Sequence, residues 1–193
     1  LSQAERARLR ELLSQRRRGV PVAYLLGRRE FWSLEFIVDS RVLIPRPETE
    51  GLVEVGCELA ARAPAGPIAD LGTGSGAVAV ALARECAERP VLALDASRAA
   101  LAVAQLNVAR LAVGRVDLVN GDWLAGLAPD RFALIVSNPP YVEDDFPDLA
   151  TAALGHEPRA ALAAGADGLD DLRRIVPDAR RCLQAGGWLA LEH

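Results

Sequence analysis

The sequence predicts an α/β fold in which a mostly parallel sheet is covered by helices on both faces. From Pro67 onward, short apolar segments alternate with alanine- and leucine-rich segments, as strands alternate with helices in such folds. A glycine-rich turn follows the first of these strands, and an acidic residue ends the second. We assign residues 46–193 to this domain and expect its last strands to lie beyond them. The expected strands are 68–71, 91–94, 116–119, 132–137 and 188–191.

The composition is that of an ordinary globular domain. Of the 193 residues, 51% are hydrophobic and 25% are charged. No run of about 18 uncharged apolar residues is present, so we expect a cytoplasmic protein without a membrane anchor. The net charge of −4 argues against a protein that tracks duplex nucleic acid. The three cysteines lie far apart and indicate neither disulfides nor a metal site. Because the sequence contains no methionine, we expect it to be part of a longer protein.

Two elements are expected before the α/β domain. Residues 1–29 are expected to form a helix and a linker, because Ser2 and Glu5 make a capping-box pattern ahead of an apolar stripe. Residues 30–45 are expected to form a β-hairpin that turns at Asp39-Ser40, because aromatic and β-branched residues flank this dipeptide.

The residues at three strand ends predict a nucleoside pocket. The glycine-rich turn after the first strand is Gly72-Thr73-Gly74-Ser75-Gly76, whose backbone N–H groups can approach a ligand closely. Such a turn can also serve packing alone. Asp95 ends the second strand, where its carboxylate can accept hydrogen bonds from both ribose hydroxyls. Asp122 and Trp123 follow the third strand at the place for an adenine ring, although Trp123 taken alone is better explained as a packing residue.

The segment after the fourth strand is the most diagnostic one, and it reads Ser137-Asn138-Pro139-Pro140-Tyr141. Its two prolines fix φ and lack N–H donors, so the carbonyls of an extended stretch can accept hydrogen bonds from a bound NH₂ group. The Asn138 side-chain oxygen adds an acceptor, and Tyr141 can stack on a planar group. Acceptors on both hydrogens orient a weakly nucleophilic nitrogen toward a sulfonium methyl group. The alternative is a rigid turn without chemistry.

These residues resemble the HemK/PrmC family of protein-glutamine methyltransferases. The resemblance implies a Rossmann-like S-adenosylmethionine-dependent methyltransferase fold, and it identifies residues 1–29 as the remnant of an N-terminal helical domain. It also implies that the substrate is the glutamine of the Gly-Gly-Gln motif in peptide-chain release factors. Besides the motifs above, it rests on Ala23-Tyr24-Leu25, Arg29-Glu30-Phe31-Trp32-Ser33-Leu34, Leu43-Ile44-Pro45-Arg46-Pro47-Glu48-Thr49-Glu50, Glu157-Pro158 and Gly186-Gly187-Trp188.

The resemblance further implies a role for each residue of the site. Asn138 and Pro139 would hold the glutamine amide, with Pro140 in the same segment and Tyr141 as a wall of the pocket. The loop 45–49 would cover the methionine end of the cofactor. The residues that would line S-adenosylmethionine are Gly72, Thr73, Gly74, Ser75 and Gly76 at the turn, Asp95 at the ribose, Asp122 and Trp123 at the adenine, and Asn138. No metal ligand is expected.

Three other functions remain open at this point. A nucleic-acid methyltransferase that acts on an exocyclic amine of adenine or guanine needs the same Asn-Pro-Pro-Tyr chemistry, but the net charge and the hairpin segment favour a protein substrate. A glutamine of a ribosomal protein is a nearer alternative, against which the segment 46–50 favours release factors. A cofactor-binding scaffold without turnover is disfavoured by Asn138 and Tyr141.

Overall fold

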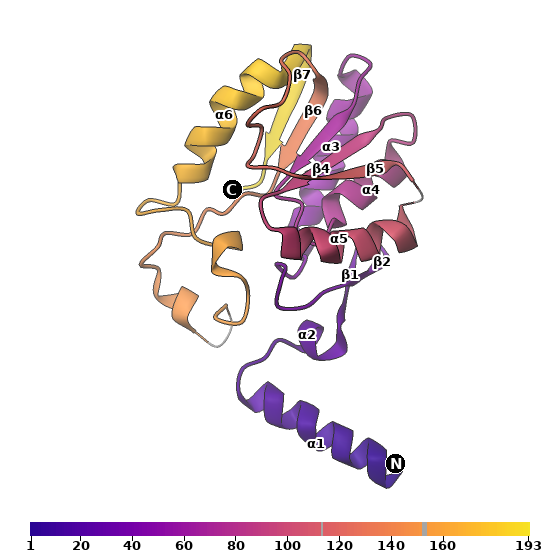
Figure 1. Ribbon diagram of the computed structural model, residues 1–193, viewed down its shortest axis with the longest axis vertical. Helices are drawn as coiled ribbons and strands as arrows, with labels where there is room; N and C mark the ends of the chain where they lie inside the picture. Colours follow the sequence, from indigo (N-terminus) through magenta and orange to yellow (C-terminus); the bar gives the residue numbers. More distant parts are fainter. Residues whose placement is uncertain (113, 152–153) are drawn as a thin grey trace.

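The computed structural model describes residues 1–193 except 113 and 152–153, and it contains the predicted α/β domain (Figure 1). Within the described residues, five strands form one parallel sheet of order β5-β4-β3-β6-β7. The prediction of a mostly parallel sheet is therefore confirmed, although the last strand starts earlier than expected. The strands are β3 (Ile68–Leu71), β4 (Val91–Asp95), β5 (Val116–Asn120), β6 (Phe132–Ser137) and β7 (Leu183–Leu191).

Helices cover both faces of the sheet, as predicted. One core contains side chains of α3 and α4 packed on strand residues such as Ile68, and partly buried residues of α5 join it. The opposite core packs Ile175 of α6 against Ile135 and its neighbours, and α6 lies alone beside that face in Figure 1. Every residue of β3 and β6 is buried, because both faces of the sheet centre are covered. These helices are α3 (Glu50–Arg62), α4 (Ala77–Glu85), α5 (Arg98–Leu111) and α6 (Asp170–Cys182).

The strand order places a crevice at one edge of the sheet. From β3 the chain continues to β4 and β5 on one side, and it then crosses to β6 and β7 on the other side. The loops that follow β3 and β6 therefore run in opposite directions from the same edge. At such a point the carboxyl ends of the strands leave room for a ligand, and each predicted site residue ends or follows a strand at this edge.

The β-hairpin is present, but its turn differs from the prediction. β1 (Arg28–Phe31) pairs antiparallel with β2 (Leu34–Ile37), so the chain turns at Trp32-Ser33 and not at Asp39-Ser40. The φ angles of Trp32 and Ser33 are 51° and 55°, and a type I′ turn needs positive φ at both central residues. The Trp32 backbone N–H donates to Glu50 Oε1 at 2.8 Å, and its indole N–H donates to Glu85 Oε1 at 2.9 Å. These distant carboxylates stabilise the turn.

Residues 38–46, here called the cover segment, continue from the hairpin toward α3. The prediction that 42–44 pairs back as a strand is wrong, because this stretch has no strand structure. It is held by side chains: the Tyr24 hydroxyl donates to the Val42 carbonyl at 2.6 Å, and Glu157 Oε2 accepts from the Ile44 N–H at 3.0 Å. The cover segment leads into η1 (Pro47–Thr49), and two further 3₁₀ helices, η2 (Pro147–Ala150) and η3 (Arg159–Ala161), follow β6.

Two helices precede the hairpin, α1 (Gln3–Arg17) and α2 (Val22–Leu26). The predicted capping box is present at the start of α1: the Glu5 N–H donates to Ser2 Oγ at 3.2 Å, and the Ser2 N–H donates to Glu5 Oε2 at 2.6 Å. None of the residues of α1 is buried, and the helix extends away from the sheet (Figure 1).

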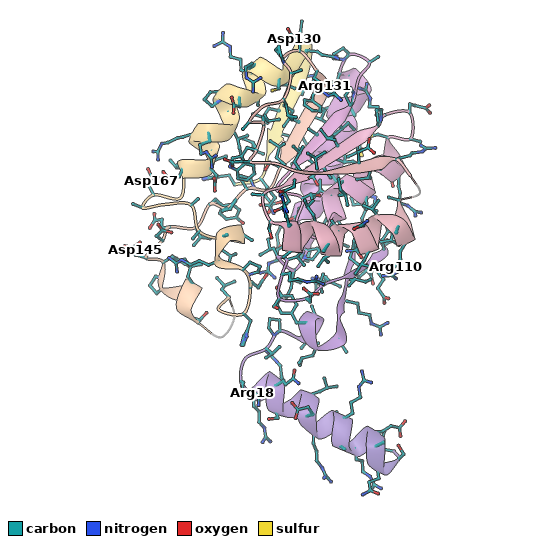
Figure 2. The ribbon with its side chains drawn as sticks, in the orientation of Figure 1. Arg18, Arg110, Asp130, Arg131, Asp145 and Asp167 are labelled. Atoms are coloured by element: carbon teal, nitrogen blue, oxygen red, sulfur yellow. The ribbon has the colours of Figure 1, made fainter. Side chains whose placement is uncertain are left out.

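Charged side chains of both signs project from the outside of the molecule, among them Arg110 on α5 and Asp167 before α6 (Figure 2). Among the described helices, none combines the length and the apolar character that crossing a lipid bilayer requires.

Candidate active site

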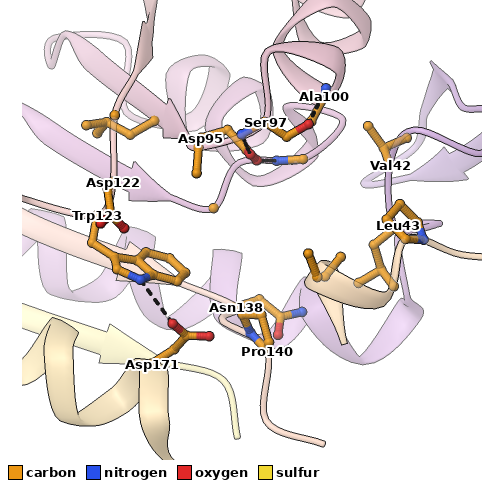
Figure 3. Close-up of a pocket in the computed structure, with 18 of the residues that line it drawn as sticks. Val42, Leu43, Asp95, Ser97, Ala100, Asp122, Trp123, Asn138, Pro140 and Asp171 are labelled. Carbon is orange, nitrogen blue, oxygen red and sulfur yellow. Dashed lines mark hydrogen bonds between the residues drawn. The ribbon is translucent and has the colours of Figure 1, made fainter. Parts of the chain in front are cut away.

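A pocket of about 300 Å³ lies at the carboxyl edge of the sheet (Figure 3). Residues that follow four different strands line it, together with part of the cover segment. Trp123 and Asp171 stand on one side of the pocket and Val42 and Leu43 on the other (Figure 3). The predicted site residues in its lining are Gly72, Gly74, Asp95, Asp122, Trp123, Asn138 and Pro140. The structure therefore brings together in one cavity residues that lie up to 68 positions apart in the sequence.

The glycine turn has a backbone that only glycine adopts readily. Gly72 has φ +68°, and a Cβ atom placed on it would lie 3.2 Å from Cζ3 of Trp123. The absence of a side chain thus lets the indole lie against the turn. Gly76, which is also predicted to line the cofactor, is the N-cap of α4 and faces Ala104 of α5. A side chain at this position would contact α5.

Thr73 and Ser75 line a smaller cavity of about 60 Å³, which also borders Asn138. The Thr73 hydroxyl donates to Asp70 Oδ2 at 2.7 Å, and the same oxygen accepts from the Ala79 N–H at 3.1 Å. Asp70 is buried, and its burial raises the pKa of the carboxyl group to about 7. Asp70 thus fixes the turn to the start of α4, a role that its place in the glycine motif did not reveal.

Asp95 is held rigidly at the edge of the pocket. Its Oδ2 accepts from the Gly74 N–H at 2.9 Å, and its Oδ1 accepts from the Ser97 N–H at 2.8 Å. A carboxylate oxygen offers more than one lone pair, so each oxygen keeps an acceptor position for a ligand. The two backbone bonds orient the carboxylate before any ligand arrives, as the prediction for a ribose site requires.

The wall around Trp123 includes two residues of α6 that the sequence did not point to. The Trp123 indole N–H donates to Asp171 Oδ1 at 3.1 Å (Figure 3), and the Asp122 carboxylate pairs with the Arg174 guanidinium. Both Asp171 and Arg174 line the pocket. The one sequence signal was the acidic first turn of α6, which the helix macrodipole alone explains. The Asp122 carboxylate is thus already paired within the protein.

The Asn-Pro-Pro-Tyr segment is anchored on the sheet side. Asn138 Nδ2 donates to Thr49 Oγ1 at 3.1 Å and to Glu192 Oε1 at 3.0 Å. Pro139 and Pro140 are buried, and Pro140 lines the pocket. Tyr141 belongs to the lining of neither cavity and is 41% exposed. Its ring centroid lies 5.8 Å from that of His193, and partial burial raises the pKa of its hydroxyl.

The pocket has the chemistry that S-adenosylmethionine needs. Its apolar side chains, which include Trp123 and Leu43, suit a flat base, and Asp95 supplies acceptors for a ribose. The turn at Gly72 leaves backbone without side chains where a ligand must approach closely. The neighbouring Asn138 provides polar atoms for a second molecule. These residues fit the cofactor that the resemblance implies.

Comparison with known proteins identifies the family of the chain. The family model of the methyltransferase small domain matches residues 56–166. A release factor glutamine methyltransferase of Xylella fastidiosa is 49% identical over 182 residues, which cover 94% of this chain and 66% of the relative. The protein of the same name in Coxiella burnetii is 44% identical over 193 residues, 100% of this chain and 69% of the relative. The chain thus spans slightly less than two thirds of the Xylella protein.

Among solved structures, a ribosomal protein L11 methylase of Lactobacillus delbrueckii is similar with a TM-score of 0.53 and 24% identity. The match covers 79% of this chain and 63% of that protein, and it supports the fold. The sequence relatives and the family model together show the family. The chain belongs to the release factor glutamine methyltransferase family, whose methyl donor is S-adenosylmethionine.

Proposed function

We propose that the protein transfers a methyl group from S-adenosylmethionine to the side-chain amide nitrogen of the glutamine in the Gly-Gly-Gln motif of peptide-chain release factors, and that it does so in the cytoplasm. The names of its relatives support this substrate. The observation that carries the chemistry is that Asn138 and Pro140 line the same pocket as Asp95 and Gly72. An amide held at Asn138 therefore lies beside a nucleoside held at Asp95.

Within this proposal each group of residues has one task. Asp95 accepts the ribose hydroxyls, Trp123 lies against the adenine, and the backbone at Gly72 and Gly74 lets the cofactor approach. The other residues of the turn stabilise it and do not line the main pocket. Thr73 and Ser75 line the smaller cavity, and Gly76 faces Ala104 of α5. Asn138 Oδ1 and the Pro139 carbonyl each accept a hydrogen bond from the glutamine NH₂ group.

When bound, the cofactor supplies a methyl group on a positively charged sulfur, which makes that carbon electrophilic. The two acceptors bind the hydrogens of the substrate NH₂ group and hold the amide nitrogen in line with this carbon. Positioning therefore supplies most of the acceleration of methyl transfer. The C–N bond forms as the C–S bond breaks, and the electron pair of the broken bond goes to sulfur. The nitrogen then releases one proton to solvent, and no strong base is needed before the transfer. Pro139 and Pro140 have no N–H group, so neither adds a donor that competes with the substrate NH₂ group for these acceptors.

A methyl-transfer assay with the full-length protein and radiolabelled S-adenosylmethionine tests the proposal. We expect label in a release factor, and none in a release factor whose Gly-Gly-Gln glutamine is replaced by glutamate. Labelling of DNA or RNA in place of the release factor would reject the protein substrate and favour the exocyclic-amine alternative. Labelling of a ribosomal protein alone would reject release factors.

The variant Asn138→Ala tests the assigned site in the same assay. We expect kcat to fall by about 100-fold or more, the scale of losing one positioned acceptor, while the cofactor Kd changes little. Gln105→Ala, an exposed substitution on α5, serves as the control and should keep full activity. Loss of cofactor binding in Asn138→Ala, with unchanged kcat at saturation, would contradict the role given to Asn138.

A further inference from the structure

The orientation of the Asn138 side-chain amide is determined by its neighbours. Its Nδ2 donates to Thr49 Oγ1 at 3.1 Å and to Glu192 Oε1 at 3.0 Å. An amide nitrogen carries two hydrogens, so these two acceptors use both of them. Oδ1 is then the polar atom of the amide that can accept hydrogen bonds from a ligand. Rotation of the amide by 180° would place its oxygen against the Glu192 carboxylate, where two acceptors repel each other.

Glu192 reaches this position through the sheet. Its backbone N–H donates to the Ser137 carbonyl at 3.0 Å, which extends the pairing of β6 and β7 by one residue. Because Ser137 directly precedes Asn138, this bond sets the Glu192 carboxylate beside the Asn138 amide. Thr49 comes from η1, so three segments distant in sequence meet at one side chain.

The environment of Glu192 is unfavourable for a residue whose only task is stability. Its Oε2 is buried and has no hydrogen-bond partner among the described residues. Burial raises the pKa of this carboxyl group, the hydrogen bonds from Thr49 and Asn138 lower it, and the nearby Glu48 raises it further. Glu192 is partly buried, and a carboxylate with a buried, unmatched oxygen weakens folding, which points to a role other than stability.

We propose that Glu192, assisted by Thr49, is a positioning residue that fixes the Asn138 amide with Oδ1 available to the substrate NH₂ group. The idea rests on the proposed function, in which Asn138 Oδ1 holds the glutamine. An anionic acceptor on Nδ2 also polarises the amide and makes Oδ1 a stronger acceptor, because hydrogen bonds in a chain reinforce one another. In this role Glu192 acts through Asn138 and does not touch the substrate.

A double-mutant cycle tests this dependence in the full-length protein. Glu192→Gln keeps the size of the side chain but removes its charge and turns one acceptor into a donor. We expect it to lower kcat about tenfold or more, with a cofactor Kd within twofold of the wild-type value. In the Asn138→Ala background the same change should have no further effect, because the group through which it acts is gone. An equal loss in both backgrounds, or wild-type kcat in Glu192→Gln, would overturn the proposal.

The hydroxyl of Thr49 provides a second, milder test. Thr49→Ser retains the acceptor for Asn138 Nδ2 and should keep kcat within about twofold, whereas the isosteric Thr49→Val should lower it in the same direction as Glu192→Gln. Equal activity of the serine and valine variants would show that the hydroxyl does not position Asn138. Thermal unfolding of each variant separates these effects from loss of the fold.

A measurement without substrate separates this inference from the proposed function. The side-chain NH₂ signals of Asn138 can be assigned in a ¹⁵N NMR spectrum by their disappearance in Asn138→Ala. We expect slow hydrogen exchange at both hydrogens in the wild-type protein and faster exchange in Glu192→Gln. Fast exchange in the wild type would overturn the positioning role alone. Protected signals in a protein that methylates no release factor would overturn the proposed function alone.

Discussion

Replacing Asn107 by alanine tests how strongly the hairpin is joined to the glycine turn. Asn107 is fully buried on α5, and its side chain makes three hydrogen bonds. It accepts from the Ile37 N–H at 2.7 Å and donates to the Ile37 carbonyl at 3.0 Å and the Ser75 carbonyl at 2.9 Å. At about 1 kcal/mol net for each bond, their loss lowers the free energy of unfolding by about 3 kcal/mol. For a chain of this size, Tm then falls by roughly 6–12 °C.

Urea unfolding and thermal unfolding, both followed by circular dichroism, measure this loss. Gln105→Ala is the matched control, because Gln105 is exposed on the same helix and its removal should change the free energy of unfolding by less than about 0.5 kcal/mol. Ser75 belongs to the glycine turn, so Asn107→Ala should also weaken cofactor binding in calorimetry. A loss of stability below about 1 kcal/mol, or one equal to that of the control, would refute the reasoning.

Three further predictions concern the cofactor site. Asp95→Ala should raise the cofactor Kd about tenfold or more in calorimetry, because two ribose hydrogen bonds to a charged acceptor are lost, and an unchanged Kd would remove Asp95 from the ribose site. Gly72→Ala should lower stability by about 1–2 kcal/mol and weaken cofactor binding, because its φ is +68° and its Cβ would press on Trp123. Gly51→Ala is its control, since a Cβ on Gly51 meets nothing within 4 Å. Replacing a helical glycine by alanine raises the free energy of unfolding by up to about 1 kcal/mol. Equal stability of the two variants would contradict the strain argument. The Asp70 carboxyl has a pKa of about 7 in the folded protein against an ordinary value of 3.8, so the folded state binds the extra proton between these values. Its contribution to stability is therefore complete below pH 3.8 and is lost as the pH rises toward 7, and parallel pH profiles of unfolding for the wild type and Asp70→Asn would contradict this.

The sheet could be predicted from the sequence because its strands are buried on both faces and read as short, uninterrupted apolar runs. The hairpin could not be predicted correctly. Its turn residues, Trp32 and Ser33, adopt positive φ without the glycine or asparagine that usually announces such a turn. The carboxylates that hold Trp32 come from Glu50 and Glu85, and no local pattern connects them with it.

For the site, the success of prediction depends on distance along the chain. Residues that end a strand or directly follow one, such as Asp95 and Asn138, could be placed because parallel strands end at a common edge. Asp171 and Arg174 line the pocket because α6 packs on the face of the sheet opposite to α3, α4 and α5. That packing is visible in the tertiary structure and not in the sequence. Glu192 likewise reaches the site through the pairing of β7 with β6.

One carboxylate ties together the two loops that flank the pocket. Glu157 accepts from the Ile44 N–H and pairs with the Arg46 guanidinium, so the cover segment is fastened to the connection that follows β6. The Glu157 side chain is almost completely shielded from water, and dissolved salt screens buried charges far less than exposed ones. We therefore expect this side of the pocket to stay closed across a wide range of ionic strength, while the exposed pair of Asp122 and Arg174 on the other side loosens as salt is added.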